Sequence, residues 1–581
     1  MHVVATAGHV DHGKSTLVRA LTGMEPDRLA EERRRGLTID LGFVWTELAG
    51  QPFAFVDVPG HQRFVPTMLA GVGPVPAVLF VVSADEGWQE QSSEHLAALD
   101  AFGVRHGLLA VTKADRADPG PVLAESVERI AFSGLGRIPA VAVSGRTGAG
   151  LDALRAELGA LGARLPNPDR GADVRLWIDR SFSIRGAGTV VTGTLGAGTL
   201  SVGDDLVLDR DGRRCVVRAL QSLGQAHDTV TAVARVAVNL RGADQHDLGR
   251  GDALLTPGAW RYTAEADVRL RGEKAERPRQ LVAHIGSVAV PCRVRPLGTD
   301  TARLSFAREL PLRAGDRGLL RDPGDHRSAG FDVLDPRPPA LRRRGAARAR
   351  AAELACDDPA VAYVRRHGAV AVEELHALGW AVPSRMMGRW AVAEDLPRRL
   401  AGRARELVAD WHERNPLSAG LPVESLRRSL DVPEDLLGPA LDDAGLAVRD
   451  GAVTDPARVS CLPEAVERAV RVVERRLAGE PFAAPEAADL AELGLGPKHL
   501  AAAERAGRLL RIADGVVLAP GCLDKAVRVL SGLAEPFTVS QARKALGTTR
   551  RVAVPLLERL DAEGRTRRAP DGTRRVRHDH T

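Results

Sequence analysis

Residues 2–22 read HVVATAGHVDHGKSTLVRALT, and this stretch decides the fold of the first part of the chain. An apolar, β-branched run at 3–7 leads into a loop bracketed by glycines, and apolar residues then recur at helical spacing from Leu17. Strand, glycine loop and helix predict a P-loop, because the glycines let backbone N–H groups converge on a phosphate at a helix N-terminus. We expect Lys14 to reach the β- and γ-phosphates and Ser15 to ligate Mg²⁺. The nucleotide-binding residues predicted here are Gly8, Asp11, His12, Gly13, Lys14, Ser15 and Thr16.

A second phosphate-side segment, DVPG, follows the apolar strand pattern of residues 53–56. We expect Asp57 to hold Mg²⁺ through a water and the N–H of Gly60 to meet the γ-phosphate. Each short motif is weak alone. Motifs in register on the ends of successive strands together predict an α/β GTP-binding domain, which we place at residues 1–168.

Two later segments are predicted to contact the base of the nucleotide and to set which base is bound. Thr112-Lys113-Ala114-Asp115 follows the strand pattern of residues 108–111, and Ser144-Gly145 follows that of residues 139–143. The Asp115 carboxylate can accept from the N1–H and N2–H₂ groups of guanine, a donor pair that adenine lacks. The pattern therefore predicts GTP and GDP as the nucleotides, with Ser144-Gly145 as the last base-contacting loop.

Composition bounds the class of protein. The 581 residues are too many for one core and predict about three to five domains. The five cysteines form neither a CxxC pair nor a disulfide framework, which suits a reducing cytoplasm. The sequence has no run of about 18 apolar residues and no signal-peptide pattern, so we expect a soluble, cytoplasmic protein without membrane contact. Only six of the 80 basic residues are lysines, so arginine clusters in this chain carry little weight alone.

At the nucleotide motifs the sequence resembles the translational GTPases of the elongation factor Tu type. The signatures are GHVDHGKS at residues 8–15, RGLTI at 35–39 and DVPGH at 57–61. The resemblance implies that Thr38 completes the Mg²⁺ shell in a switch loop ordered by the γ-phosphate. It also implies that His61, together with Lys14, is catalytic, with His61 orienting the attacking water when the ribosome pushes it inward.

One residue departs from the family pattern. Thr112 stands where most such GTPases have asparagine. We expect this change to weaken the bracing of the loop while leaving the guanine contact of Asp115 intact.

Short alternating strand patterns follow residue 168. Asp211-Gly212 between two apolar strands predicts a hairpin, and glycine-punctuated strands predict small β-barrels. We expect one barrel at 169–259 and a second at 260–340. Residues 185–193 resemble the second domain of the same factors, in which the GTPase domain and the two barrels together hold an aminoacyl-tRNA.

About 240 residues remain beyond an ordinary factor, beginning with a basic, alanine-rich connector at 342–350. EPF at 480–482 recurs at 535–537, each time before two helix-like segments and a basic strand pair that turns at Asp-Gly. Helix, helix and two-stranded wing predict winged helices, which we place at 345–402, 403–458, 459–521 and 522–581. The expected fold class is multidomain α/β + β + α: a P-loop GTPase domain, two β-barrels and tandem C-terminal winged-helix domains.

The last copy is the most basic, with eleven Lys/Arg against four acids between Arg543 and Arg577. Thr548 or Thr549 can cap a helix whose first turn presents two arginines, and the wing supplies four more for phosphates. The alternative is a solvated arginine-rich surface. The nucleic-acid contacts predicted here are Arg550, Arg551, Arg567, Arg568, Arg574 and Arg575.

An elongation-factor core with four winged helices resembles the bacterial selenocysteine-specific elongation factors. The likeness covers the whole chain, most strongly residues 1–260 and 520–581. It implies delivery of selenocysteyl-tRNA to the ribosome at UGA codons marked by an mRNA stem-loop, which the basic winged helix binds; we expect a monomer. RNA hairpins are read through splayed loop bases and backbone shape, which suits a compact basic module.

A pocket for the aminoacyl group follows from aligning WIDRSF at 177–182 and ARVA at 234–237 with the family's first barrel. The alignment puts Asp179, Arg180 and Arg235 around the amino-acid side chain. A selenol is more acidic than a thiol and is ionised at neutral pH, so guanidinium groups favour the selenolate and offer less to the hydroxyl of serine. We expect the two arginines to discriminate against seryl-tRNA; the alternative is a pair of solvated or acid-paired barrel arginines.

Other functions compete with this one. Another translational GTPase that delivers a specialised or initiator tRNA would lack the tail. A GTP-switched DNA-binding regulator would use the winged helices on a duplex, and a salt series comparing stem-loop RNA with duplex DNA separates the two. A non-enzymatic scaffold is disfavoured by Lys14, Asp57 and His61.

Overall fold

The computed structural model divides the chain into two compact units, residues 1–366 with 370–383, and residues 367–369 with 384–581. It describes every residue except 27–31, 33–37, 74, 187, 273–278, 325–327, 357, 459–461 and 578–581. Arg35 to Leu37 of the switch signature therefore lie outside the described residues.

The GTPase domain is a six-stranded sheet of order β2-β3-β1-β4-β5-β6, parallel except for β2, which pairs antiparallel with β3. Helices α1 and α6 pack on one face and α3, α4 and α5 on the other, because successive buried side chains of the strands point alternately into the two helix layers. Parallel strands end at one edge of a sheet, which brings the loops after β1, β3, β5 and β6 together. The elements are β1 (His2–Ala7), α1 (Lys14–Thr22), β2 (Gly42–Leu48), β3 (Gln51–Asp57), η1 (Gln62–Phe64), α3 (Val65–Val72), β4 (Ala77–Ser83), α4 (Glu90–Phe102), β5 (His106–Thr112), α5 (Gly120–Ala131), β6 (Ala140–Ala142) and α6 (Leu151–Arg164).

The first β domain is an antiparallel sheet around a single core. Its path runs β7-β16-β11-β12-β15-β9-β8, and the end strands β7 and β8 are consecutive in the chain, so the sheet returns on itself. The hairpin predicted at Asp211-Gly212 is confirmed between β11 and β12. The strands are β7 (Arg175–Trp177), β8 (Arg180–Ile184), β9 (Gly188–Leu195), β10 (Thr199–Ser201), β11 (Asp205–Leu208), β12 (Arg214–Ser222), β13 (Gln225–His227), β14 (Thr229–Thr231), β15 (Ala234–Arg241) and β16 (Ala253–Leu255).

The second β domain is a closed barrel, β17-β20-β19-β18-β21-β22. Apolar side chains alternate inward along its strands and fill the interior. The strands are β17 (Tyr262–Arg271), β18 (Arg279–Ile285), β19 (Val288–Pro296), β20 (Thr301–Pro311), β21 (Arg317–Arg321) and β22 (Ser328–Asp335).

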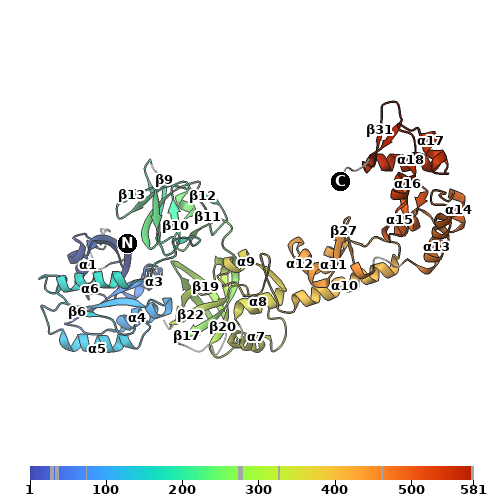
Figure 1. The fold of residues 1–581 in the computed structure, drawn as a ribbon. Coiled ribbons are helices and arrows are strands. Elements are labelled where there is room, and N and C mark those ends of the chain that lie inside the picture. The colour runs from blue at the N-terminus through green and yellow to red at the C-terminus, as the bar shows by residue number, and fades with distance from the viewer. Residues whose placement is uncertain are drawn as a thin grey trace. The chain divides into compact units, whose positions relative to one another are not determined.

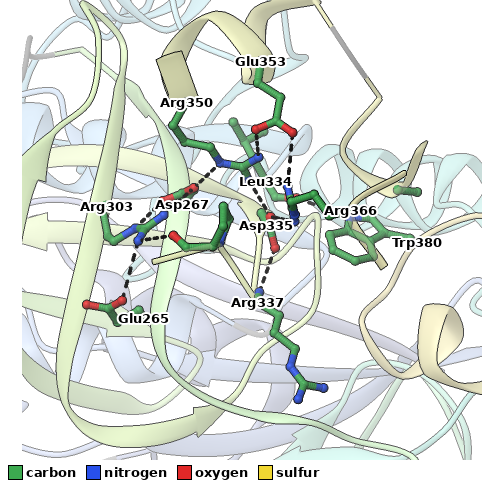
Figure 2. Close-up of polar contacts among 12 residues, drawn as sticks. Glu265, Asp267, Arg303, Leu334, Asp335, Arg337, Arg350, Glu353, Arg366 and Trp380 are labelled. Carbon is green, nitrogen blue, oxygen red and sulfur yellow. Dashed lines mark hydrogen bonds and ion pairs between the residues drawn. The ribbon is translucent and has the colours of Figure 1, made fainter. Parts of the chain in front are cut away.

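A buried ion network joins this barrel to the helix that follows it (Figure 2). Asp267 on β17 lies opposite Asp335 on β22 and, on its other side, opposite Arg303 on β20, to which it is paired. Two facing carboxylates, both 0% exposed, would repel each other without a cation. Arg350 of α7 (Ala346–Cys356) supplies it: Nε donates to Asp267 (2.7 Å), Nη1 to Glu353 (2.6 Å) and Nη2 to Asp335.

The next two helices are fixed to the same barrel. Arg366 of α8 (Pro359–His367) donates to Asp335 at 3.2 Å. Glu374 of α9 (Val372–Ala377) accepts from Arg261 at 2.6 Å, and the indole of Trp380 donates to the carbonyl of Leu334. Residues 346–350, the end of the segment predicted to be a basic connector, belong to α7, and Arg350 among them is buried.

The tail repeats three helices and a two-stranded hairpin, as the winged-helix pattern predicts (Figure 1). The hairpins turn at Asp450-Gly451, Asp514-Gly515 and Asp571-Gly572. Helix α10 runs unbroken across residue 402, where we placed a boundary between two winged helices. The remaining elements are β23 (Ala369–Ala371), β24 (Met386–Met387), β25 (Trp390–Val392), α10 (Leu396–Arg414), β26 (Leu421–Pro422), α11 (Val423–Leu430), α12 (Glu434–Ala444), β27 (Ala447–Arg449), β28 (Ala452–Thr454), η3 (Pro456–Arg458), α13 (Glu464–Gly479), α14 (Ala487–Glu492), α15 (Pro497–Arg505), β29 (Leu510–Ala513), β30 (Val516–Leu518), α16 (Cys522–Leu530), α17 (Val539–Ala545), α18 (Arg550–Ala562), β31 (Thr566–Arg568) and β32 (Arg574–Val576).

The last two winged helices share one hydrophobic core, to which the repeated phenylalanines Phe482 and Phe537 both contribute. Thr549 is the N-cap of α18 but makes no side-chain capping bond, whereas the hydroxyl of Thr548 donates to the carbonyl of Phe482 at 2.5 Å. The expected fold class is confirmed. No helix among the described residues is long and apolar enough to cross a membrane.

Candidate functional site

The P-loop lies between β1 and α1. Gly8 (φ +131°) and Gly13 (φ +81°) adopt conformations that favour glycine, and a Cβ at Gly8 would collide with the backbone of Val81. Lys14 is buried beneath the loop, and its Nζ donates to the carbonyls of Gly8 (2.9 Å) and His9 (2.7 Å). Burial lowers the pKa of Lys14 to about 8. The loop is thus held around the lysine predicted to meet the phosphates.

The three residues predicted to hold Mg²⁺ meet at one point. Ser15 Oγ donates to Asp57 Oδ2 at 2.6 Å and lies 2.9 Å from Thr38 Oγ1. The other Asp57 oxygen accepts from Thr6 Oγ1 at 2.7 Å, which fixes the carboxylate. Two hydroxyls and a carboxylate are the hard oxygen donors that Mg²⁺ prefers, so the residues fit the ion.

The guanine-side residues also come together. Ser144 Oγ donates to Asp115 Oδ1 at 2.6 Å, and this bond lowers the pKa of Asp115, which keeps the carboxylate ionised as an acceptor. Lys113 Nζ lies 2.8 Å from Glu86 Oε1. Gly145 leaves room for Thr16, whose methyl would lie 3.3 Å from a Cβ there.

Thr112 braces the loop more than we expected. Its buried hydroxyl donates to the carbonyl of His12 at 2.6 Å, which ties the guanine-binding loop directly to the P-loop. The threonine therefore supplies a bracing hydrogen bond of its own.

Two residues that the sequence analysis missed accept hydrogen bonds from the backbone of the P-loop. Gln91 and His95 lie one turn apart on α4; the N–H of Gly8 donates to His95 Nδ1 (3.0 Å) and that of Val10 to Gln91 Oε1 (3.3 Å). Burial lowers the pKa of His95 to about 3, so the ring is neutral and can accept. Polar residues at i and i+4 on the buried side of a helix were the available signal.

His61 is exposed and follows Gly60 directly. Gly60 touches the P-loop, because a Cβ there would lie 2.7 Å from the nitrogen of Val10. His61 Nδ1 accepts from the N–H of Arg63 at 3.2 Å, which leaves Nε2 as the protonated nitrogen of the neutral ring. The side chain is thus displayed beside the phosphate end of the site.

The structure brings the three predicted aminoacyl-pocket residues together. Arg235 forms a bidentate pair with Asp179, donating from Nη2 at 2.6 Å and also from Nη1. Thr192 Oγ1 donates to the same carboxylate at 2.7 Å. Arg180 lies on the adjoining strand β8, the first residue after Asp179.

The sequence analysis missed three further residues that contact this predicted cluster: Asp40 and Phe43 from the GTPase domain, and Arg250. The guanidinium of Arg235 lies 3.7 Å from the ring centre of Phe43, a cation–π contact. Arg180 Nη2 donates to Asp40 at 3.0 Å, and Arg250 also donates to Asp40. These contacts lie far apart in sequence, so only the fold reveals them.

The six predicted RNA-contacting arginines divide into two groups. Arg574 is 3% exposed and donates to Asp561 at 2.8 Å. Arg551 donates to the carbonyl of Pro485 at 2.7 Å and so joins the last two winged helices. These two arginines stabilise the fold. The four that remain exposed are Arg550, Arg567, Arg568 and Arg575.

Two family profiles match the chain, one near each end. The sequence profile of the elongation factor Tu GTP-binding domain matches residues 1–161. The profile described as elongation factor SelB, winged helix, matches residues 528–575. A crystal structure of a bacterial selenocysteine-specific elongation factor, EF-Sec, superimposes with a TM-score of 0.77 at 24% identity over 100% of both chains, which shows the same fold.

Curated relatives extend this likeness. The chain is 39% identical over 353 residues (59% of this chain, 56% of the relative) to the selenocysteine-specific elongation factor of Escherichia coli strain K12. Elongation factor Tu 2 of Streptomyces avermitilis is 32% identical over 375 residues, 56% of this chain and 95% of that protein. The selenocysteine-specific elongation factor of Desulfomicrobium baculatum is 33% identical over 462 residues, 72% of this chain and 73% of the relative. This chain, a translational GTPase, therefore belongs to the family of selenocysteine-specific elongation factors.

Proposed function

We propose that this protein delivers selenocysteyl-tRNA to the ribosome at UGA codons, guided by an mRNA stem-loop that its tail binds. It acts in the cytoplasm as a monomer. In this proposal residues 1–168 bind and hydrolyse GTP, 169–259 hold the aminoacyl group, and 522–581 bind the stem-loop. The observation that carries it is the cluster of three arginines beside the nucleotide site, in a chain of this family.

GTP hydrolysis times the delivery. Ser15, Thr38 and Asp57 would hold Mg²⁺, which neutralises charge on the β- and γ-phosphates when bound. Lys14, held at the P-loop carbonyl of Gly8, would meet the phosphates, and backbone N–H groups of the P-loop would provide the remaining donors. His61 orients the attacking water through its ring once the ribosome repositions it.

Selenocysteine is distinguished from serine by charge. Arg180 and Arg235 favour the selenolate through charge-assisted contacts, whereas a neutral hydroxyl gains little from the same groups. Replacing both arginines with methionine should lower the ratio of selenocysteyl-tRNA to seryl-tRNA affinity. An unchanged ratio would contradict this assignment.

The stem-loop is bound through the exposed arginines of the last winged helix. Arg550 begins the helix, and Arg567, Arg568 and Arg575 lie on the wing. Four phosphate contacts predict a marked loss of affinity with salt.

The most informative experiment is recovery of the tRNA bound to the purified protein, followed by its sequencing. We expect one tRNA species, the selenocysteine-inserting tRNA. Recovery of ordinary elongator or initiator tRNAs would refute the proposal in favour of a general translational GTPase. A filter-binding comparison of stem-loop RNA with duplex DNA tests the DNA-regulator alternative separately.

A further inference from the structure

Asp40 of the GTPase domain divides its carboxylate between two arginines of the first β domain. Oδ2 accepts from Arg180 Nη2 at 3.0 Å, and Oδ1 accepts from Arg250 Nη2. Arg250 is tied to the predicted pocket as well, because its Nε donates to the carbonyl of Asp179 at 3.0 Å. Asp40 and Arg250 therefore belong to the same cluster as the residues that face the aminoacyl group.

The charges within these ion pairs do not cancel. Arg235 is matched one-to-one by Asp179 in a bidentate pair. Asp40 is shared by two guanidinium groups, so these ion pairs contain three arginines and two carboxylates, a net charge of +1 within the set. The buried Glu32, whose Oε1 accepts from the N–H of Asp40 at 3.1 Å, lies beside the set.

The arginines of this cluster differ in how far they are available to a ligand. Arg235 is 11% exposed and uses both terminal nitrogens on Asp179. Arg180 is 32% exposed and donates only from Nη2; its Nε and Nη1 make no hydrogen bond to any residue that the structure describes. Arg180 is thus the more exposed of these two arginines and keeps a terminal nitrogen for a ligand, and Asp40 and Arg250 decide how much of its charge is compensated.

We propose that Asp40 and Arg250 are specificity-determining residues of the aminoacyl pocket, which together set how much arginine charge is left for a single selenolate. The inference rests on the proposed function of this pocket. A seryl group carries no charge, so its affinity depends little on the net charge. The affinity for an anionic side chain depends on it directly.

The expected size follows from Coulomb's law. One unit charge about 10 Å from the ligand, at an effective dielectric constant of about 20, changes affinity roughly tenfold or somewhat more. Asp40→Asn leaves three arginines against one acid, a net charge of two. Arg250→Gln leaves two against two, a net charge of zero. The double variant restores a net charge of one.

The test measures the affinity of full-length protein, loaded with a non-hydrolysable GTP analogue, for selenocysteyl-tRNA and for seryl-tRNA of the same tRNA. We expect Arg250→Gln to lower the selenocysteyl-to-seryl ratio about tenfold and Asp40→Asn to raise it about tenfold. The double variant should return to within about threefold of wild type. Asp152→Asn, which removes another Asp–Arg pair of the GTPase domain, is the matched control and should leave the ratio unchanged.

The outcomes separate the two proposals. If the wild-type protein does not prefer selenocysteyl-tRNA, the proposed function of the pocket fails. If it does, but the single variants change both affinities equally, the role of Asp40 and Arg250 is refuted while the pocket stands. A double variant that discriminates no better than Arg250→Gln also refutes it, because restored charge would then not restore specificity.

Discussion

Replacing Arg350 with methionine should release α7 from the second barrel. The change keeps an unbranched, apolar stem but removes the guanidinium that contacts Asp267, Glu353 and Asp335. Two facing carboxylates, both 0% exposed, then lose a shared cation. Removing one partner from a buried ion pair costs about 3–5 kcal/mol. At 1.36 kcal/mol per factor of ten, about 3 kcal/mol corresponds to more than a hundredfold change in local opening.

Hydrogen exchange measured by mass spectrometry on the full-length protein is the suitable assay, because a multidomain chain has no single unfolding free energy. We expect peptides from residues 346–356 to exchange at least a hundredfold faster in Arg350→Met. Arg348→Met, which removes an exposed arginine of the same helix, is the control and should resemble wild type. A second change, Asp335→Asn, should restore part of the protection, because it removes the carboxylate that lost its partner.

Acid should rescue the same variant. Burial raises the pKa of Asp335 against the lowering effect of Arg350, so loss of Arg350 raises it further. The folded protein then binds more protons than the unfolded chain between the ordinary and the raised pKa, and stability falls as pH rises through that range. The defect should therefore shrink as pH falls from 7.5 toward 5. An exchange rate within about threefold of wild type at pH 7.5, or no rescue by either route, would refute the ion-network argument.

Three further outcomes are expected. Thr112→Val, which removes the hydrogen bond to His12, should speed GDP release roughly fivefold in fluorescent-nucleotide kinetics, and Thr112→Asn should not; equal rates would contradict the bracing role. Burial lowers the pKa of His95 to about 3 and of His12 to about 4, so the folded GTPase domain binds fewer protons than the unfolded chain and loses stability as pH falls below about 6.5. At pH 5 this loss is roughly 2 kcal/mol for each histidine, visible as a lower melting temperature that His95→Gln makes less pH-dependent. Arg550→Ala should weaken stem-loop binding and reduce its salt slope by about one, whereas Arg551→Ala should increase hydrogen exchange between the last two winged helices without that change in slope.

The nucleotide site was predictable because phosphate and guanine chemistry fixes residue types within short segments. A P-loop needs glycines, a lysine and a hydroxyl at set spacing, and a parallel sheet brings successive strand ends together. The same reasoning missed His95, since its contact with Gly8 joins residues 87 positions apart, and the spacing of Gln91 and His95 on one helix does not show which loop they meet. Thr112 was predicted to weaken the bracing of its loop, because the sequence cannot reveal that the threonine hydroxyl lies within reach of a backbone carbonyl.

The roles of the charged residues were the least predictable feature of the chain. Arg350 was read as part of a basic connector, yet it is 2% exposed between carboxylates from two strands of a barrel. Arg574 was read as a phosphate contact and is buried against Asp561. The sequence of an arginine-rich chain shows how many cations there are. It does not show which arginines form ion pairs, because their acidic partners lie on other strands and helices. Only the fold separates structural arginines from those left for a ligand.

One short segment connects the sites that the sequence analysis treated separately. Thr38 lies 2.9 Å from Ser15 at the metal end of the nucleotide site, Asp40 pairs with the pocket arginines, and Phe43 stacks under Arg235. Thr38, Asp40 and Phe43 lie within six residues of one another, so we expect a ligand that repositions Thr38 to shift the side chains that line the predicted aminoacyl pocket as well. Linkage is reciprocal: any factor by which GTP strengthens aminoacyl-tRNA binding must equal the factor by which the aminoacyl-tRNA strengthens GTP binding. The predicted aminoacyl pocket and the predicted nucleotide site therefore share one short segment, residues 38–43.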